Sequence, residues 1–114
     1  DRGYVTYSDA AKRQALGVEE AVLARHGAVS REVVLQMADR ALRTSGADVA
    51  VALSGIAGPD GGTVHKPVGL VWFALTLRGG AGRTEHQHFT GSREAVRRAA
   101  TARALALLAA APAL

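Results

Sequence analysis

The sequence predicts a single α/β domain in which helices pack against a mixed sheet. Its 114 residues are 48% hydrophobic and 21% charged, a balance typical of one globular domain with its own core. Strand-like segments and segments of helical periodicity follow one another in the order β-α-α-α-β-β-β-α. A glycine-rich loop comes directly after the apolar run at residues 49–53, where α/β proteins bind ligands. These observations also favour a small-molecule site.

The first half of the chain predicts one short strand and three helices. Residues 3–7 alternate as a strand does. Helices are expected over residues 10–16, 19–25 and 31–44, each bounded by a polar cap residue or a glycine. Ser30 is a suitable N-cap for the third helix, whose apolar residues fall on one stripe.

The second half predicts three strands and a final helix. Residues 48–54 form a short apolar run typical of a buried strand, and residues 68–77 form a longer one. Residues 83–89 are polar on both faces, which indicates a strand at the edge of the sheet. Ser92 is expected to cap a helix that extends to about residue 111.

The charge balance favours an anionic partner. The chain has 14 Lys and Arg against 10 Asp and Glu, a net charge of +4. A phosphate-bearing metabolite and a nucleic acid both fit this charge. Nucleic acid is the less favoured partner, because aromatic residues are only 4% and no recognition-helix pattern is present.

The composition also limits the location and the chemistry. No cysteine is present, which excludes disulfides and thiolate catalysis. No apolar run reaches the roughly 18–20 residues of a membrane span, so we expect no membrane partner and a cytoplasmic protein. Much of the apolar content is alanine, which buries little area, and we therefore expect part of the apolar surface to be covered in a homodimer.

The most informative segment is the glycine-rich loop at residues 54–62. Its glycine spacing matches neither the phosphate loop of nucleoside triphosphatases nor the dinucleotide fingerprint. Its backbone N–H groups could instead face an anion or an oxyanion. The alternative is a tight connection between two strands.

Two groups of side chains are candidates for catalysis and binding. Tyr7 and Lys12 lie at a strand-to-helix junction, where a buried lysine could act as a general base. A solvated lysine beside a core-edge tyrosine is the simpler interpretation from the residues alone. Arg93, Arg97 and Arg98 open the last helix, where they could hold a phosphate or form a solvated face.

The histidines predict no metal site. His86 and His88 share one face of a strand, but no third ligand lies close in sequence. His26 and His65 carry no functional signal of their own. We therefore expect neither a metal nor a cofactor.

Along its whole length the chain closely resembles the CinA C-terminal domain family. Five segments carry the resemblance, in order and at matching spacing: GYVTYSDAAK at 3–12, LGV at 16–18, HGAVS at 26–30, SGIAGPDGG at 54–62 and KPVG at 66–69. The characterised activity of the family is that of a nicotinamide-nucleotide amidohydrolase, also called nicotinamide mononucleotide deamidase.

The resemblance implies a three-layer α/β/α sandwich that commonly dimerises and hydrolyses nicotinamide mononucleotide to nicotinic acid mononucleotide and ammonia without a metal. The family's chemistry is of the Ser–Lys amidase type. A serine attacks the amide, a lysine accepts its proton and a tyrosine assists. The matching positions imply catalytic roles for Lys12 and Tyr7. They imply substrate binding by Gly55, Ile56, Ala57, Gly58, Gly61, Gly62 and Arg93.

The family's nucleophilic serine lies in an Ala-Glu-Ser-Cys-Thr-Gly-Gly-like segment upstream of the tyrosine, and the 114 residues contain no such segment. Neither Ser8 nor Ser54 occupies the matching position. We therefore expect residues 1–114 to be a single CinA C-terminal-like domain, truncated by an N-terminal strand and helix relative to the family. The alternative function is a non-catalytic nucleotide-binding or competence-related interaction domain.

Overall fold

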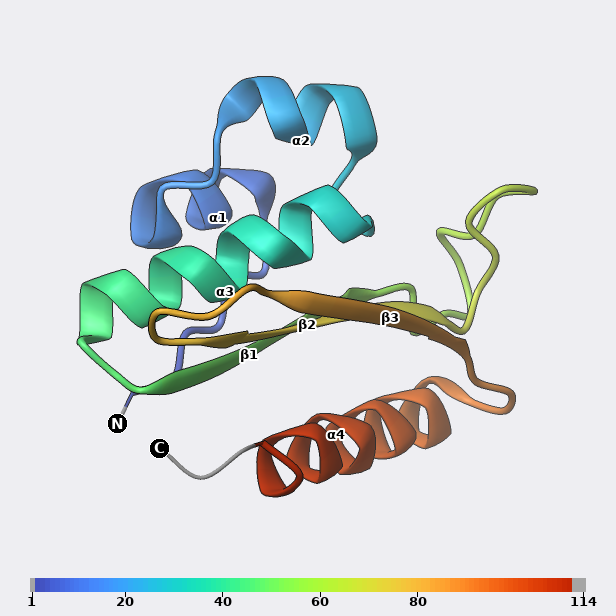
Figure 1. Ribbon diagram of the computed structural model, residues 1–114. Coiled ribbons are helices and arrows are strands. Elements are labelled where there is room, and N and C mark those ends of the chain that lie inside the picture. Colours follow the sequence, from blue (N-terminus) through green and yellow to red (C-terminus); the bar gives the residue numbers. More distant parts are fainter. Residues whose placement is uncertain (1, 112–114) are drawn as a thin grey trace.

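Four helices and a three-stranded sheet form three layers in the computed structural model, which describes residues 2–111. Helices α1 (Asp9–Leu16), α2 (Glu20–His26) and α3 (Arg31–Ser45) cover one face of the sheet, and α4 (Arg93–Ala109) covers the other (Figure 1). The predicted α/β class and its three layers are thereby confirmed.

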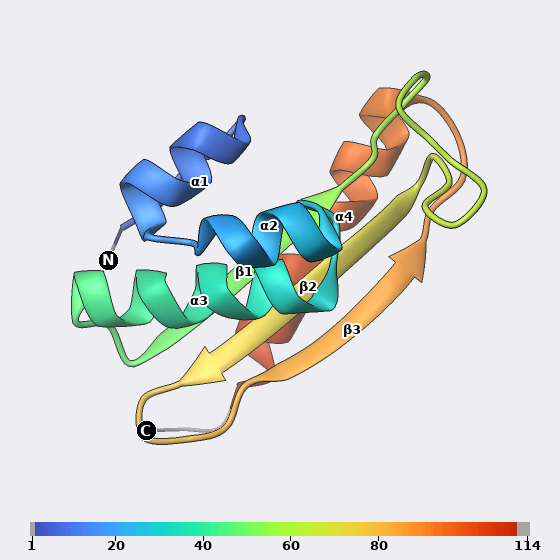
Figure 2. The same ribbon diagram turned by 90° about the horizontal axis from the view of Figure 1, so that it is seen from above.

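The sheet contains β1 (Val49–Gly55), β2 (Leu70–Leu77) and β3 (Arg83–His88), with β2 in the middle. Both pairings are antiparallel, and Trp72 lies opposite His86. Among the described residues the sheet is therefore antiparallel, where the sequence predicted a mixed one. The predicted edge position of β3 is confirmed (Figure 2).

The strand predicted near the N-terminus is not formed. Residues 2–7 have no strand structure. A groove of about 760 Å³ is lined by Gly3 and Tyr4 on one side and by Val51 and Leu53 of β1 on the other. A strand requires a neighbour for its backbone hydrogen bonds, and the alternation of side chains does not supply one. The outer edge of β1 therefore has no ladder partner within residues 2–111.

The helix starts follow the predicted caps. The hydroxyls of Ser8, Ser30 and Ser92 accept backbone N–H groups three residues later, at 3.0 to 3.3 Å. Each bond satisfies one of the amides that a helix N-terminus leaves without an intrahelical partner. The helix starts predicted at Ser30 and Ser92 are thus confirmed, and the helix expected from residue 10 begins one residue earlier, at Asp9.

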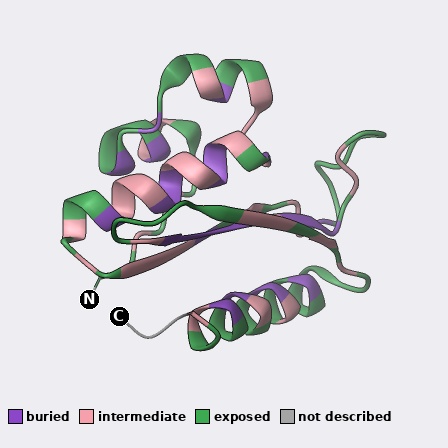
Figure 3. Ribbon diagram, viewed as in Figure 1, coloured by how far each residue is buried: buried purple, intermediate pink, exposed green. Residues whose placement is uncertain are grey.

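The core is split between the two faces of the sheet (Figure 3). Ala74 packs with the α1–α3 layer, together with Val33 and Val34 of α3. Val71 and Phe73 belong to the second cluster, which includes the inward face of α4. Alternate residues of β2 therefore join the sheet to both helical layers, as expected of a central strand.

None of the helices within residues 2–111 has the length and apolar character needed to cross a membrane.

Candidate functional site

A cavity of about 500 Å³ at the end of β1 brings together three segments that are far apart in the sequence. The segment before α1, the start of the loop between β1 and β2, and the start of α4 all line it. Of the residues expected at the site, it is lined by Tyr7, Lys12, Gly55, Ile56, Ala57, Gly58, Gly61 and Arg93.

Lys12 is buried in α1 with only 7% of its surface exposed, so it is not a solvated surface residue. Its Nζ donates a hydrogen bond to the carbonyl oxygen of Thr6 at 2.7 Å. Burial lowers the pKa of Lys12, and the nearby carboxylate of Asp9 partly opposes that lowering. A buried amine with a lowered pKa and a neutral acceptor is suited to receive a proton.

Arg93 connects two walls of the cavity. One terminal nitrogen donates to the carbonyl oxygen of Gly58 at 3.1 Å, and the other donates to the hydroxyl of Tyr7 at 3.3 Å. Tyr7 itself is 85% exposed, so it is a rim residue and not a core-edge residue. The arginine therefore holds the N-terminal segment and the glycine-rich loop beside each other.

The two other candidate arginines lie outside this cavity. Arg97 and Arg98 line a separate surface hollow along α4, together with Arg93. Arg98 forms an exposed ion pair with Glu94 at 2.8 Å. Only Arg93 of the three is positioned to contact a ligand beside Lys12.

Glycine is required in the loop because the chain folds back on itself there. Gly58 has a φ of 85°, and a Cβ at this position would lie 2.5 Å from Cγ1 of Val68. A Cβ at Gly62 would lie 2.7 Å from the backbone nitrogen of Val68. Gly62 is thus packed against the returning arm of the loop and does not line the cavity, unlike the other glycines expected at the site.

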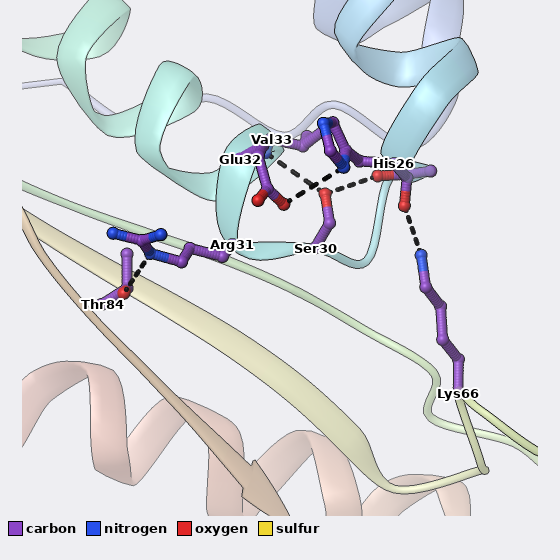
Figure 4. Close-up of polar contacts among 8 residues, drawn as sticks. His26, Ser30, Arg31, Glu32, Val33, Lys66 and Thr84 are labelled. Carbon is purple, nitrogen blue, oxygen red and sulfur yellow. Dashed lines mark hydrogen bonds and ion pairs between the residues drawn. The ribbon is translucent and has the colours of Figure 1, made fainter.

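The returning arm of the same loop carries a residue to which the sequence alone assigns no role. Nζ of Lys66 donates to the carbonyl oxygen of His26, the last residue of α2 (Figure 4). Positive side chains stabilise helix C-termini through contacts of this kind. The sequence contains only two signals for this contact, namely the lysine of the KPVG segment and the predicted helix end near His26 and Gly27.

No group of three or more His, Cys, Asp or Glu side chains in residues 2–111 is placed to hold a metal ion. The rings of His86 and His88 lie 5.8 Å apart, centre to centre, at 89° to each other. The polar side chains that the described part of the chain offers at the cavity, around a glycine-rich backbone, are those of Lys12, Arg93, Tyr4, Tyr7, Asp60, Ser54 and Thr6.

The chain is similar to known proteins over nearly its whole length. Residues 1–111 match the family model described as "CinA C-terminal domain". The chain is 57% identical over 108 residues to "Nicotinamide-nucleotide amidohydrolase PncC" of Escherichia coli strain K12, covering 95% of this chain and 66% of that protein. It is 58% identical over 104 residues to a "CinA-like protein" of Akkermansia muciniphila, covering 91% of this chain and 25% of that protein.

The fold agrees as well. The structure of the competence/damage inducible protein CihA from Agrobacterium tumefaciens superposes with a TM-score of 0.93 at 47% identity, covering 96% of this chain and 67% of that one. The chain thus spans about two thirds of the length of the shorter relatives it matches. With the family model matched over almost every residue, the chain belongs to the CinA C-terminal domain family.

Proposed function

We propose that this chain forms the base-bearing and substrate-binding part of a nicotinamide-nucleotide amidohydrolase. The proposed reaction converts nicotinamide mononucleotide to nicotinic acid mononucleotide and ammonia. The observation that carries the proposal is the buried amine of Lys12, which lines the same cavity as Tyr7, the glycine-rich loop and Arg93. Relatives named for this activity support the reaction class.

The reaction needs an activated nucleophile, because an amide is a poor electrophile. In the proposed mechanism a serine Oγ attacks the carboxamide carbon while its proton passes to the neutral amine of Lys12. The lysine returns that proton to the departing ammonia as the C–N bond breaks, and water then hydrolyses the ester. The lowered pKa of Lys12 favours the neutral amine that this mechanism requires. The family resemblance assigns the serine to a segment that the 114 residues do not contain.

The other groups have binding roles in this proposal. The acceptors of Arg93 are the carbonyl of Gly58 and the hydroxyl of Tyr7, both neutral, so its charge remains available for a 5′-phosphate. Backbone N–H groups of Ala57 and Gly58 would stabilise the oxyanion or contact the pyridine ring, whereas that of Ile56 already donates to the carbonyl of Leu70. Tyr7 would assist the lysine at the cavity rim.

The test compares ammonia release from nicotinamide mononucleotide by a chain extended with the family's serine segment and by its Lys12→Met variant. We expect the variant to bind the nucleotide but to lose about 10²–10⁴-fold in turnover, the range for a lost general base. Arg97→Gln is the control, since it removes a positive charge outside the cavity. Ammonia release that is unchanged in Lys12→Met would contradict the proposed mechanism.

A non-catalytic nucleotide-binding or competence-related interaction domain is the second candidate, because matching relatives include a "CinA-like protein" whose name states no enzymatic activity. Calorimetric titration with nicotinamide mononucleotide separates the two. If the extended chain binds the nucleotide and releases no ammonia, the binding domain is the correct function.

The expected homodimer and cytoplasmic location also belong to the proposal. Val5 and Val64 are 92% and 94% exposed, and Leu105 is 61% exposed, so apolar surface is available for a second copy. Light scattering on the purified chain measures its oligomeric state directly.

A further inference from the structure

All four histidines of the chain line one cavity of about 430 Å³, although they are widely separated in sequence. This cavity has no lining residue in common with the cavity beside Lys12. It lies between the N-terminal end of α3, the end of the loop before β2, and β3. We call it the four-histidine cavity; its histidines are His26, His65, His86 and His88.

Aromatic rings from neighbouring strands form part of its wall. Trp72 of β2 lies directly opposite His86 of β3 in the strand register. Their ring centroids are 4.6 Å apart with the planes tilted by 43°, and the ring of His88 continues the series. The wall therefore presents flat rings with polar edges to whatever occupies the cavity.

Two permanent positive charges line the same cavity, and neutral groups hold both. Lys66 donates to the carbonyl oxygen of His26, and Nε of Arg31 donates to the hydroxyl of Thr84 at 3.3 Å (Figure 4). Neither cation forms an ion pair with a carboxylate within residues 2–111. Their charges are thus held in place without being neutralised.

One carboxylate also lines the cavity, and it is already engaged. Glu32 lies 3.5 Å from Nδ1 of His26, so its charge is directed to that imidazole (Figure 4). Ser30 is engaged too, because its hydroxyl donates to the carbonyl of Gly27 at 2.7 Å and caps α3. The positive end of the α3 dipole points toward the same space. The groups left for a ligand are therefore Lys66, Arg31 and the imidazoles of the other three histidines.

We propose that the four-histidine cavity binds a doubly charged oxyanion, namely a phosphate group, either free or carried by a mononucleotide. Its two uncompensated cations provide charge complementarity, and the rings of Trp72 and His86 provide a surface for a planar group. The proposal is independent of the amidohydrolase function.

Trp72 is the only tryptophan of the chain and lines this cavity, so tryptophan fluorescence can report on a ligand bound there. We would titrate the chain with sulfate, a doubly charged oxyanion, at pH 7 and constant ionic strength. A saturable change in tryptophan fluorescence is expected. Lys66→Gln and Arg31→Gln should each weaken binding about tenfold, while the charge-matched control Arg97→Gln should match the wild type.

A second arm identifies the source of the oxyanion by comparing inorganic phosphate with adenosine monophosphate at pH 7. Tighter binding of the mononucleotide would mean that the rings hold a base, and equal binding would mean a free oxyanion site. The proposal is overturned by the lack of a saturable response, or by equal affinity in the wild type and both variants. If Lys66→Gln does not fold, Arg31→Gln alone tests the proposal. Arg31 is exposed, so its substitution should leave the fold intact.

Discussion

Arg103 on the α4 face of the sheet and three cations that line the cavities on the α1–α3 face are held in different ways. On the α4 face, Arg103 makes two hydrogen bonds to the carboxylate of Glu85, both at 2.6 Å. On the α1–α3 face, Lys12, Lys66 and Arg31 are held by backbone carbonyls or a hydroxyl. An acid neutralises Arg103, whereas neutral acceptors leave the other three cations charged or able to exchange protons. The arginines of the α1–α3 layer that pair with acids line neither cavity; they are Arg13, Arg40 and Arg43.

We call the α4 side of the sheet, where Arg103 pairs with Glu85, the structural face. The α1–α3 side, which carries Lys12, Lys66 and Arg31 beside the two cavities, is the chemical face. The ion pair with Glu85 neutralises the charge of Arg103 and joins β3 to α4. A cation held by neutral groups keeps a charge for a ligand, but its burial costs stability when no acid compensates it. The lysines and arginines that line the two proposed binding sites all have neutral partners; they are Lys12, Arg93, Lys66 and Arg31.

The largest expected effect is a loss of stability on the structural face. Phe73 is fully buried in the cluster that joins the sheet to α4, and its ring packs edge-on against Phe89 at 6.4 Å. Phe73→Ala should reduce the free energy of unfolding by about 3–5 kcal/mol, measured by denaturant titration. Leu105→Ala is the control, since Leu105 of α4 is 61% exposed and its truncation should change stability by less than about 0.5 kcal/mol. Equal losses in the two variants would show that α4 is not docked as described.

An intermediate effect of opposite sign is expected on the chemical face. Lys12→Met keeps the length of the side chain and removes the buried amine, so the free energy of unfolding should rise by about 1 kcal/mol near neutral pH. The hydrogen bond to Thr6 is lost in the same variant and offsets part of the gain.

The pH dependence of that gain has a definite sign. Because the pKa of Lys12 is lowered from 10.5 on folding, the unfolded state binds more protons between the two values. Wild-type stability therefore rises with pH through that window, and the advantage of Lys12→Met is greatest below it and shrinks toward pH 10.5. Thermal unfolding at several pH values measures this difference. A variant that is less stable than the wild type at neutral pH would contradict this account of Lys12.

Most of the fold could be predicted from local signals. The serine caps and the glycine after α1 mark helix ends, and the apolar runs mark β1 and β2. The segment at residues 2–7 could not be assigned correctly, because alternation describes only the side chains of a strand. Whether a strand forms depends on a neighbour, and the sequence of one segment does not contain that information.

The candidate site was predictable only in part, and mainly through the family resemblance. Burial of Lys12 depends on how α1 packs, so the residues alone favoured a solvated lysine. The contact of Arg93 with Tyr7 joins residues 86 positions apart, which no local pattern reveals. The cavity that the four histidines share could not be predicted from a local pattern either, because these residues come from α2, β3 and a loop.

The smallest expected effect at neutral pH is that of Glu85→Gln, which removes the paired carboxylate of the structural face. The hydrogen bond from Arg103 is the main cause of the lowered pKa of Glu85, with burial opposing it. A lowered pKa means that the stabilisation is complete above the unfolded value of 4.5 and is lost as the pH falls through the folded value. The variant should therefore melt below the wild type at pH 7 and approach it as the pH falls through the folded value. Glu94→Gln removes the acid of an exposed pair, with 78% of that side chain accessible, and should leave the acid limb of the curve unchanged. If Glu85→Gln and Glu94→Gln give the same pH profile, the Arg103 pair is no more structural than a surface pair, and the distinction between the two faces rests on apolar packing alone.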